Sequence, residues 1–247
     1  MIKISMVTWN RRPILERVLQ AIFDTCPEEY ELYVTSNACT DGTNELLKDL
    51  EAQGKLRAWY LPENLGTDIG RNASHWPECV GFDTVRMDDK VLPLASGWLT
   101  ALKVASDRFH AIVGPPYDPS VRQLEVFAPP VECVDWPQDQ GRGGPLLFIP
   151  GQVTAALGAC DELDPEHKYG WTDCLYIERA ILLGWHFNFT LHVPVEFLAQ
   201  ADSARRNSAM QWHPLYLERR RQYQEAERDV WIDPESTIGW RAKHGLS

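Results

Sequence analysis

The first 110 residues alternate between short apolar runs and amphipathic stretches. Residues 2–9 (IKISMVTW) form a β-rich apolar run that is typical of a buried strand. Residues 11–24 then place apolar side chains at the three- and four-residue spacing of one helical face. The same alternation predicts further strands at 31–36, 56–62 and 82–87 and further helices at 40–52, 64–74 and 97–109. Strands that alternate with helices predict an α/β fold with a doubly wound, mostly parallel sheet flanked by helices.

The second half of the chain has a weaker pattern. Residues 115–145 are rich in Pro, Gly and Gln, which indicates loops around a short strand. A strand and a helix are expected again at 145–163, an amphipathic helix within 169–185, β-structure at 187–200 and a charged helix at 213–228. We therefore expect residues 1–110 and 111–200 to be two halves of one domain, and residues 201–247 to be a short C-terminal helical extension.

Polar clusters follow each of the first four predicted strands. Their sequences are TWNRR, SNACTDGT, ENLGTDIGRN and MDDK. Ligands of open α/β sheets bind beyond the carboxyl ends of the strands, so the four clusters predict one site at that edge. In the fourth cluster, Lys90 follows Asp88 and Asp89 at once, and adjacent acids at the end of a buried strand typically hold a cation or a polar ligand.

Composition limits the classes of partner. The 247 residues carry a formal net charge of −11, which argues against a broad basic surface for nucleic acid. Residues 201–247 hold 8 Lys/Arg against 7 Asp/Glu, so the acidity lies in residues 1–200, and an anionic ligand there needs a metal ion or placed basic side chains. The six cysteines form no CxxC pair, which predicts reduced, mostly buried thiols. Without a run of about 20 apolar residues or a signal-peptide layout, we expect a cytoplasmic protein with no membrane span.

These motifs, taken in order, resemble glycosyltransferase family 2, whose members are inverting enzymes of the GT-A fold. VTWNR resembles the nucleotide loop after the family's first strand, SNACTDGT its DNGSTDGT segment, and NLGTDIGRN its glycine- and arginine-bearing turn. MDDKVLP resembles its metal-binding acidic motif, GACDEL its GGFDE segment, and residues 169–185 its acceptor-side helix. The resemblance covers about residues 3–200. It implies transfer of a sugar from a nucleotide-diphosphate donor, with a UDP-sugar expected, to an acceptor hydroxyl.

The chain departs from the family pattern at three places. Ser36 stands where the family has an acid beside the nucleobase, which leaves the base of the donor open. Lys90 replaces the last acid of the family's Asp-x-Asp motif. Thr172 and Asp173 stand where the family has a Glu-Asp pair before the acceptor helix.

The resemblance implies a Mg²⁺ or Mn²⁺ ion on the acidic motif, held by Asp88 and Asp89. The family's histidine ligand has no counterpart in its matching region, where Asp202 is a further candidate. Lys90 raises an alternative, because in an extended segment it shares a face with Asp88 while Asp89 points the other way. A lysine about 4 Å from a phosphate oxygen gains roughly 4 kcal/mol at an effective dielectric constant near 20. Either Lys90 partly or wholly replaces the ion beside the diphosphate, or the metal stays and Lys90 turns to solvent.

Asp173 is the candidate general base. It lies at the start of a helix whose apolar face is expected to pack inward, so its carboxylate can face the cleft and accept the proton of an acceptor hydroxyl. The alternative is that Asp173 is the N-cap of that helix. Trp171 and Thr172 are candidate acceptor-binding residues, since a flat aromatic ring suits a sugar or a nucleobase.

The candidates for donor binding lie in the four polar clusters. They are Thr8, Asn10, Arg11, Ser36, Asn37, Asp41, Gly66, Asp68, Arg71 and Asp88. Asn37 or Asp41 can take over from Ser36 at the nucleobase. Asn10 and Asp41 also suit helix capping, and Arg71 can either bind phosphate or brace the two acids of the MDDK motif.

Other functions are compatible with the same residues. Arg205, Arg206 and Arg219–Arg221 permit a nucleic-acid acceptor, such as the hydroxymethylated bases of phage DNA, beside a glycan or small-molecule acceptor. A nucleotidyltransferase would usually have a glycine-rich loop after the first strand, and TWNRRP has no glycine. A catalytically silent sugar-nucleotide binder is suggested by the altered acidic motif.

Overall fold

The structure, a computed structural model, describes residues 1–75, 78–115, 133–135, 144–160, 172–190 and 192–198, together with Glu218, Arg221, Gln222 and Glu225. The strands are β1 (Ile2–Thr8), β2 (Tyr30–Asn37), β3 (Arg57–Leu61), β4 (Thr84–Asp88), β5 (Val91–Pro93), β6 (Ala111–Gly114), β7 (Cys133–Asp135), β8 (Leu146–Ile149), β9 (His186–Thr190) and β10 (Val195–Phe197). The helices are α1 (Arg12–Thr25), α2 (Thr43–Ala52), α3 (Gly66–His75), α4 (Trp98–Phe109), α5 (Gly151–Leu157) and α6 (Thr172–Leu182).

The described strands form an eight-stranded sheet in the order β3–β2–β1–β4–β8–β6–β9–β7. Parallel pairs join β3 to β2, β2 to β1, β1 to β4 and β6 to β9. The antiparallel strands are β8, which lies between β4 and β6, and β7, which pairs with β9. The predicted doubly wound, mostly parallel sheet is therefore confirmed, with one reversed strand in its interior.

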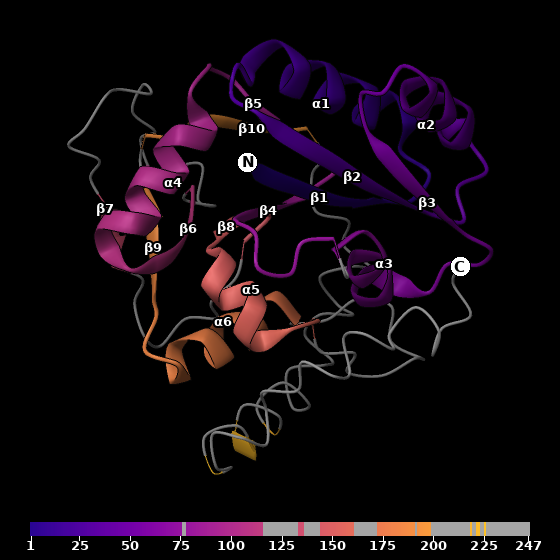
Figure 1. Cartoon of the computed structure of the whole chain (residues 1–247). Coiled ribbons are helices and arrows are strands. Elements are labelled where there is room, and N and C mark those ends of the chain that lie inside the picture. Colours follow the sequence, from indigo (N-terminus) through magenta and orange to yellow (C-terminus); the bar gives the residue numbers. More distant parts are fainter. Residues whose placement is uncertain are drawn as a thin grey trace.

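Helices cover both faces of this sheet (Figure 1). One apolar cluster joins α1, α2 and α4 to one face, with Leu15, Leu47 and Trp98 among its members. Separate clusters join α5 and α6, and then α3, to the opposite face. Because side chains alternate along a strand, Phe148 of β8 belongs to the first cluster and its neighbour Leu147 to the second.

The structure corrects three local expectations. Arg11 occupies the N-cap position of α1, so Asn10 is not its cap. Gly42 occupies the N-cap position of α2, so Asp41 is not in that position. The chain does not stay extended after β4; it turns at Asp89–Lys90 and then enters β5.

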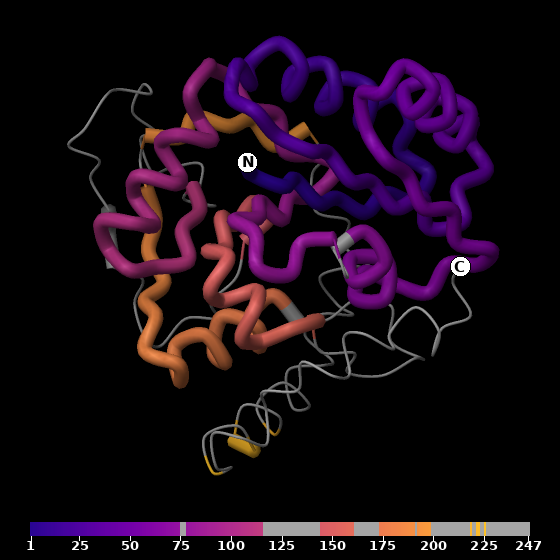
Figure 2. Tube along the Cα trace, in the orientation of Figure 1, coloured from indigo at the N-terminus to yellow at the C-terminus, as the bar shows by residue number. Residues whose placement is uncertain are grey.

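A second, two-stranded sheet holds the chain just after that turn. β10 pairs antiparallel with β5, and the orange segment that ends in β10 runs back to β5 in Figure 2. The backbone N–H of Leu198 donates to the carbonyl of Lys90 (2.9 Å), and that of Leu94 donates to the carbonyl of Pro194 (3.1 Å). Residues from the two halves of the sequence thus fix the path of the chain around the MDDK motif.

The eight-stranded sheet draws its strands from both residues 1–110 and residues 111–200. Of residues 201–247 the structure describes only four, all helical, and there Arg221 pairs with Glu218 (2.8 Å) and Glu225 (2.7 Å). The rest of the expected C-terminal extension lies outside the described residues. Within the described part of the chain, no helix has the length and hydrophobicity needed to cross a membrane. Five described cysteines are free and buried: Cys26, Cys39, Cys79, Cys160 and Cys174.

Candidate functional site

The carboxyl ends of β1, β2 and β4 meet at one edge of the sheet. The register places Thr8 beside Ser36 and Val7 beside Asp88. A cavity of about 40 Å³ opens at this edge, and its lining comes from the three strand ends, the loops that follow them and the start of α3. The lining residues are Val7, Thr8, Trp9, Arg11, Asn37, Thr67, Asp88 and Asp89. The polar clusters that follow the strands therefore do surround a common space.

Asp88 is held by two cations. Arg71 Nη2 lies 2.6 Å from Asp88 Oδ1, and Lys90 Nζ lies 3.1 Å from Asp88 Oδ2. The three side chains are only 13%, 11% and 14% exposed for Arg71, Lys90 and Asp88 respectively. Lys90 therefore does not turn to solvent, and Arg71 braces Asp88 from the opposite carboxylate oxygen.

Asp89 faces away from this pair and towards the first strand. Its Oδ1 accepts a hydrogen bond from Arg11 Nη1 (2.8 Å), and its Oδ2 accepts one from the hydroxyl of Thr8 (2.8 Å). Burial raises the pKa of Asp89 above its ordinary value; the charge of Arg11 opposes this effect and the charge of Asp88 adds to it. Arg11, whose side chain is 30% exposed, remains accessible from the cavity.

Asp173 lies in the first turn of α6 and within electrostatic reach of Arg71. Burial alone would lower the pKa of Arg71, but the charges of Asp88, Asp173 and Asp68 raise it. Asp173 Oδ2 accepts from the backbone N–H of Gly144 (3.1 Å), and Oδ1 accepts from the N–H of Cys174 (3.0 Å). As the second residue of the helix, Asp173 is not in the N-cap position. The charges of Asp88 and Asp173 thus both act on Arg71.

Asn37 fixes the turn that leads into α3. Its Oδ1 accepts from the N–H of Leu65 (3.0 Å), and its Nδ2 donates to Asn64 Oδ1 (3.0 Å) and to the carbonyl of Gly66 (2.9 Å). Gly66 has a φ of +88°, which favours glycine. Both groups of the Asn37 amide are therefore used to shape the wall of the cavity.

Three other candidates are also engaged by neighbouring loops. The buried hydroxyl of Ser36 donates to Asn44, and Asn10 Oδ1 accepts from the N–H of Thr40 (2.7 Å). Asp41 Oδ2 accepts from the N–H of Arg12 (2.8 Å) at the start of α1. These hydrogen bonds position the loops that follow β1 and β2.

Some residues at this edge of the sheet were not predicted from the sequence, and some predicted site residues lie outside the described part of the chain. Trp9, with 45% of its surface exposed, and Thr67 both line the cavity, although neither was a candidate. The signal for Trp9 was a large aromatic residue just past a buried strand and inside a polar cluster. Trp171, Asp202 and the side chain of Thr172 lie outside the described residues.

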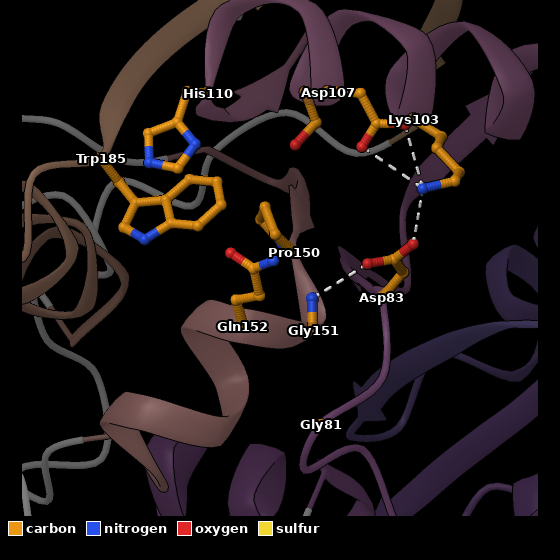
Figure 3. Close-up of a pocket in the computed structure, with 10 residues that line it drawn as sticks. Gly81, Asp83, Lys103, Asp107, His110, Pro150, Gly151, Gln152 and Trp185 are labelled. Carbon is orange, nitrogen blue, oxygen red and sulfur yellow. Dashed lines mark hydrogen bonds and ion pairs between the residues drawn. The ribbon is translucent and has the colours of Figure 1, made fainter.

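A larger cavity, about 410 Å³, lies at the opposite edge of the sheet (Figure 3). It is lined by residues that precede β4, β6 and β9, among them Asp83, His110 and Trp185. His110 stacks on Trp185 with ring centroids 3.7 Å apart, and Lys103 bridges Asp83 (2.9 Å) and Asp107 (3.1 Å). Since ligands of such sheets bind at the carboxyl ends of the strands, we assign the functional site to the smaller cavity in spite of its volume.

The chain resembles known proteins in part of its sequence and in its fold. The family described as "Glycosyl transferase family 2" matches residues 4–74, which include most of β1, all of α1, β2, α2 and β3, and most of α3. No sequence among the curated proteins matches the chain.

Solved structures with the same fold extend over nearly the whole chain. S. aureus TarS 1–349 in complex with UDP-GlcNAc has a TM-score of 0.65 and 13% identity, covering 93% of this chain and 68% of that one. The mannosyltransferase PcManGT from Pyrobaculum calidifontis, in complex with GDP-Man and Mn²⁺, has a TM-score of 0.61 and 16% identity, covering 98% and 68%. GalNAc-T7 with UDP, GalNAc and Mn²⁺ has a TM-score of 0.63 and 14% identity, covering 100% and 55%.

The chain is short beside some of these proteins. It covers 34% of another S. aureus TarS chain, which matches 76% of this one at 15% identity with a TM-score of 0.57. At such identities the likeness is one of fold.

Proposed function

We propose that this chain, which carries a glycosyl transferase family 2 segment at residues 4–74 and the GT-A fold, transfers a sugar from a nucleotide-sugar donor to an acceptor hydroxyl. The family match and the shared fold support a glycosyltransferase as the class of enzyme. The observation that carries the reaction is local: Arg71 bonds Asp88 at the tip of β4 and is close enough to Asp173 for that carboxylate to raise its pKa. We therefore propose that a donor-binding tip and a carboxylate base lie on either side of this cation.

The donor is expected to enter the cavity at the ends of β1 and β2. Trp9 offers an exposed aromatic face for a nucleobase or a ribose. Arg11 lines the same cavity and presents a guanidinium that suits a phosphate group. UDP- and GDP-sugars are the donors to test first, because neighbours of this fold are bound to UDP-GlcNAc and to GDP-Man.

Asp173 is proposed as the general base of an inverting transfer. Each carboxylate oxygen can accept more than one hydrogen bond, so the N–H groups of Gly144 and Cys174 orient Asp173 and still leave it able to accept a proton. The proton of the acceptor hydroxyl passes to Asp173, and the acceptor oxygen forms a bond to the anomeric carbon. The bond from that carbon to the diphosphate breaks, and its electron pair leaves with the diphosphate. Attack on the face opposite the leaving group inverts the configuration of the sugar.

The described residues do not fit a resident divalent cation. Both oxygens of Asp88 bond cations, and both oxygens of Asp89 bond Arg11 or Thr8. Among the residues that the structure describes, no three His, Cys, Asp or Glu side chains form a group that could hold a metal ion. Two neighbours of this fold contain Mn²⁺, whereas the transfer proposed here relies on the basic side chains that pair with Asp88.

The acceptor is proposed to be a glycan or a small hydroxyl compound that approaches from the α6 side. The alternative of a nucleic-acid acceptor depended on the C-terminal arginines. Arg221, the one among them that the structure describes, is bonded to Glu218 and Glu225 on its own helix. That pairing supports a solvated helical face.

The test of this function is the variant Asp173→Asn. Release of UDP or GDP from nucleotide sugars and transfer to a panel of glycans are expected to fall by about 10²-fold or more, since general-base assistance is lost. Binding of the nucleotide, measured by thermal shift, should stay within about threefold because Asp173 does not line the donor cavity.

Asp107→Asn is the matched control, because Asp107 lies at the opposite edge of the sheet and should keep full activity. An active Asp173→Asn variant would reassign the base. Wild-type protein that binds a nucleotide sugar but releases no nucleoside diphosphate would be a binding protein.

A further inference from the structure

We infer that Lys90 and Arg71 together supply the positive charge that balances the departing diphosphate, so that the transfer needs no divalent cation. This inference rests on the proposed function, because Asp88, with which both cations pair, lines the proposed donor cavity. Departure of a nucleoside diphosphate develops negative charge, and a site that catalyses it must place positive charge there in advance.

The two cations are organised around one carboxylate. Arg71 pairs with Asp88 Oδ1 at 2.6 Å, and Lys90 pairs with Asp88 Oδ2 at 3.1 Å. The Asp88 carboxylate therefore positions both basic groups. All three side chains are less than 15% exposed. Because these charges lie out of bulk water, they act on a nearby anion more strongly than surface lysines would.

The backbone around Lys90 is also fixed. The N–H of Asp88 donates to the carbonyl of Pro145 (2.6 Å), where β4 meets the start of β8. The carbonyl of Lys90 accepts from the N–H of Leu198, where β5 meets β10. Hydrogen bonds on both sides of the Asp89–Lys90 turn therefore fix the backbone from which the Lys90 side chain starts, and the ion pair with Asp88 places its ammonium group.

The ion pairs at the tip argue in the same direction. In these pairs Arg11, Arg71 and Lys90 contribute three positive charges against two from Asp88 and Asp89, while Asp173 and Asp68 add two negative charges that act on Arg71. An acid in place of Lys90 would make the local charge more negative by two units, and a divalent cation is the natural partner of such an acidic group. With Lys90 present, a divalent ion on Asp88 would have to displace two bonded cations and then sit beside them.

Direct binding tests this inference on the wild-type protein. Binding of inorganic pyrophosphate, UDP and GDP is measured by calorimetry, once in excess EDTA and once in Mn²⁺. Pyrophosphate is included because it has no nucleobase, so its affinity depends on Lys90 and Arg71 and not on which base the donor carries. We expect the affinity of at least one of these probes to change by less than about threefold between the two conditions. Binding that disappears in EDTA and returns with Mn²⁺ would overturn the inference.

The variant Lys90→Asp should convert the site to a metal-dependent one. Without metal, its affinity for pyrophosphate should fall by at least about tenfold, since a charge-assisted bond is lost and an acid is gained. With Mn²⁺ the affinity should recover, and the electron paramagnetic resonance signal of free Mn²⁺ should decrease as the ion binds. Lys55→Asp, which makes the same charge change at an exposed position that does not line the cavity, should show neither effect.

A second variant guards against misfolding. If Lys90→Asp unfolds at the assay temperature, Lys90→Asn replaces it and should lose the same tenfold in EDTA without the rescue by Mn²⁺. Lys90 variants that keep wild-type affinity in EDTA would overturn the inference. If wild-type protein binds none of the three probes under either condition, the proposed donor site itself is wrong, and the inference is wrong with it.

Discussion

Asp41 shows how one carboxylate can organise two loops of the donor edge. Oδ2 accepts from the backbone N–H of Arg12, the first residue of α1, at 2.8 Å. Oδ1 accepts from the hydroxyl of Thr43 at 2.6 Å and from its N–H at 3.2 Å, at the first residue of α2. Helix starts carry unpaired N–H groups and a partial positive charge, so a single anion stabilises both.

The ionisation of Asp41 should therefore contribute to stability in a definite pH range. Burial would raise its pKa, but the hydrogen bonds from Arg12 and Thr43 outweigh burial and hold the pKa below the ordinary value of 3.8. The stabilisation is complete above pH 3.8 and is lost as the pH falls through the lower folded-state pKa.

Urea unfolding of wild type and Asp41→Asn measures this effect. The variant should be less stable at pH 6, and the gap should narrow as the pH falls below 3.8. A gap that stays constant with pH would show that the charge of Asp41 has no role in holding the helix starts.

Sequence reasoning at this scale found the residues but not their bonds. Asp41, Asn10 and Asn37 were recognised because they lie in polar clusters after strands. Which partner each would bond depends on loops that approach from elsewhere in the chain, such as Thr40 for Asn10 and the Asn64–Gly66 turn for Asn37. A residue type and its place in the chain do not fix such an approach.

Among the elements, α3 approaches the proposed donor cavity through a glycine. It packs against β1 at Gly70, where an added Cβ would lie 2.6 Å from Val7 Cγ2 and 3.4 Å from Asn37 Nδ2. Val7 and Asn37 both line the cavity. The missing side chain therefore sets how near the helix comes to the donor site.

The substitution Gly70→Ala has two opposing effects on the free energy of unfolding. Alanine favours a helix over glycine by about 1 kcal/mol, while overpacking costs about 1–3 kcal/mol. Because a contact of 2.6 Å against a β-branched side chain cannot be relieved by a simple rotation, we expect a net loss of stability in urea unfolding and weaker nucleotide binding.

The double variant Val7→Ala/Gly70→Ala removes the atom that the new Cβ would meet. It should lose less stability than the sum of the two single variants, which a double-mutant cycle measures directly. A Gly70→Ala protein more stable than wild type would mean that helix propensity prevails and that the packing at this crossing is loose.

The sequence predicted the longer elements well and the shortest ones poorly. Periodicity over 10 or more residues identified α1, α2 and α4, and apolar runs identified β1, β2 and β4. β5 was not predicted, and β10 was merged into a single β-region with β9. Each has only three residues, so its pattern carries little information, and each exists through pairing with a segment about a hundred positions away.

The molecule as a whole has one apolar layer and one mixed layer around its sheet. On the face that packs α5 and α6, two buried arginines lie near the ring of Tyr176: Arg86 of β4 at 5.4 Å and Arg179 of α6 at 5.9 Å. Arg179 donates to the backbone carbonyls of Leu157 and Ala159 at the end of α5. The guanidinium nitrogens of Arg86 have no hydrogen-bond partner among the residues that the structure describes.

The two arginines should therefore respond in opposite ways to replacement. Arg179→Met is expected to lower the free energy of unfolding by about 1–3 kcal/mol, because it leaves two buried carbonyls without their donor. Arg86→Met removes a buried charge that has no hydrogen-bond partner among the described residues, so it should be neutral or stabilising, by up to about 3 kcal/mol.

Urea unfolding at neutral pH compares the two variants directly. A loss of similar size in both would mean that Arg86 is as well satisfied as Arg179 in solution. Thermal unfolding monitored by circular dichroism should rank the two variants in the same order.

The position of β8 has a consequence for how the chain is made. Once residue 115 has emerged from the ribosome, strands β3, β2, β1 and β4 can already assemble, since all four precede that residue in the chain. One side of β4 must then wait for residues 146–149, which pair with it only after a further stretch of translation. A bare strand edge readily joins another chain, so the nascent protein is most prone to aggregate in that interval. A chaperone that shields β4, or a faster passage of the ribosome through residues 116–145, would raise the yield of folded protein.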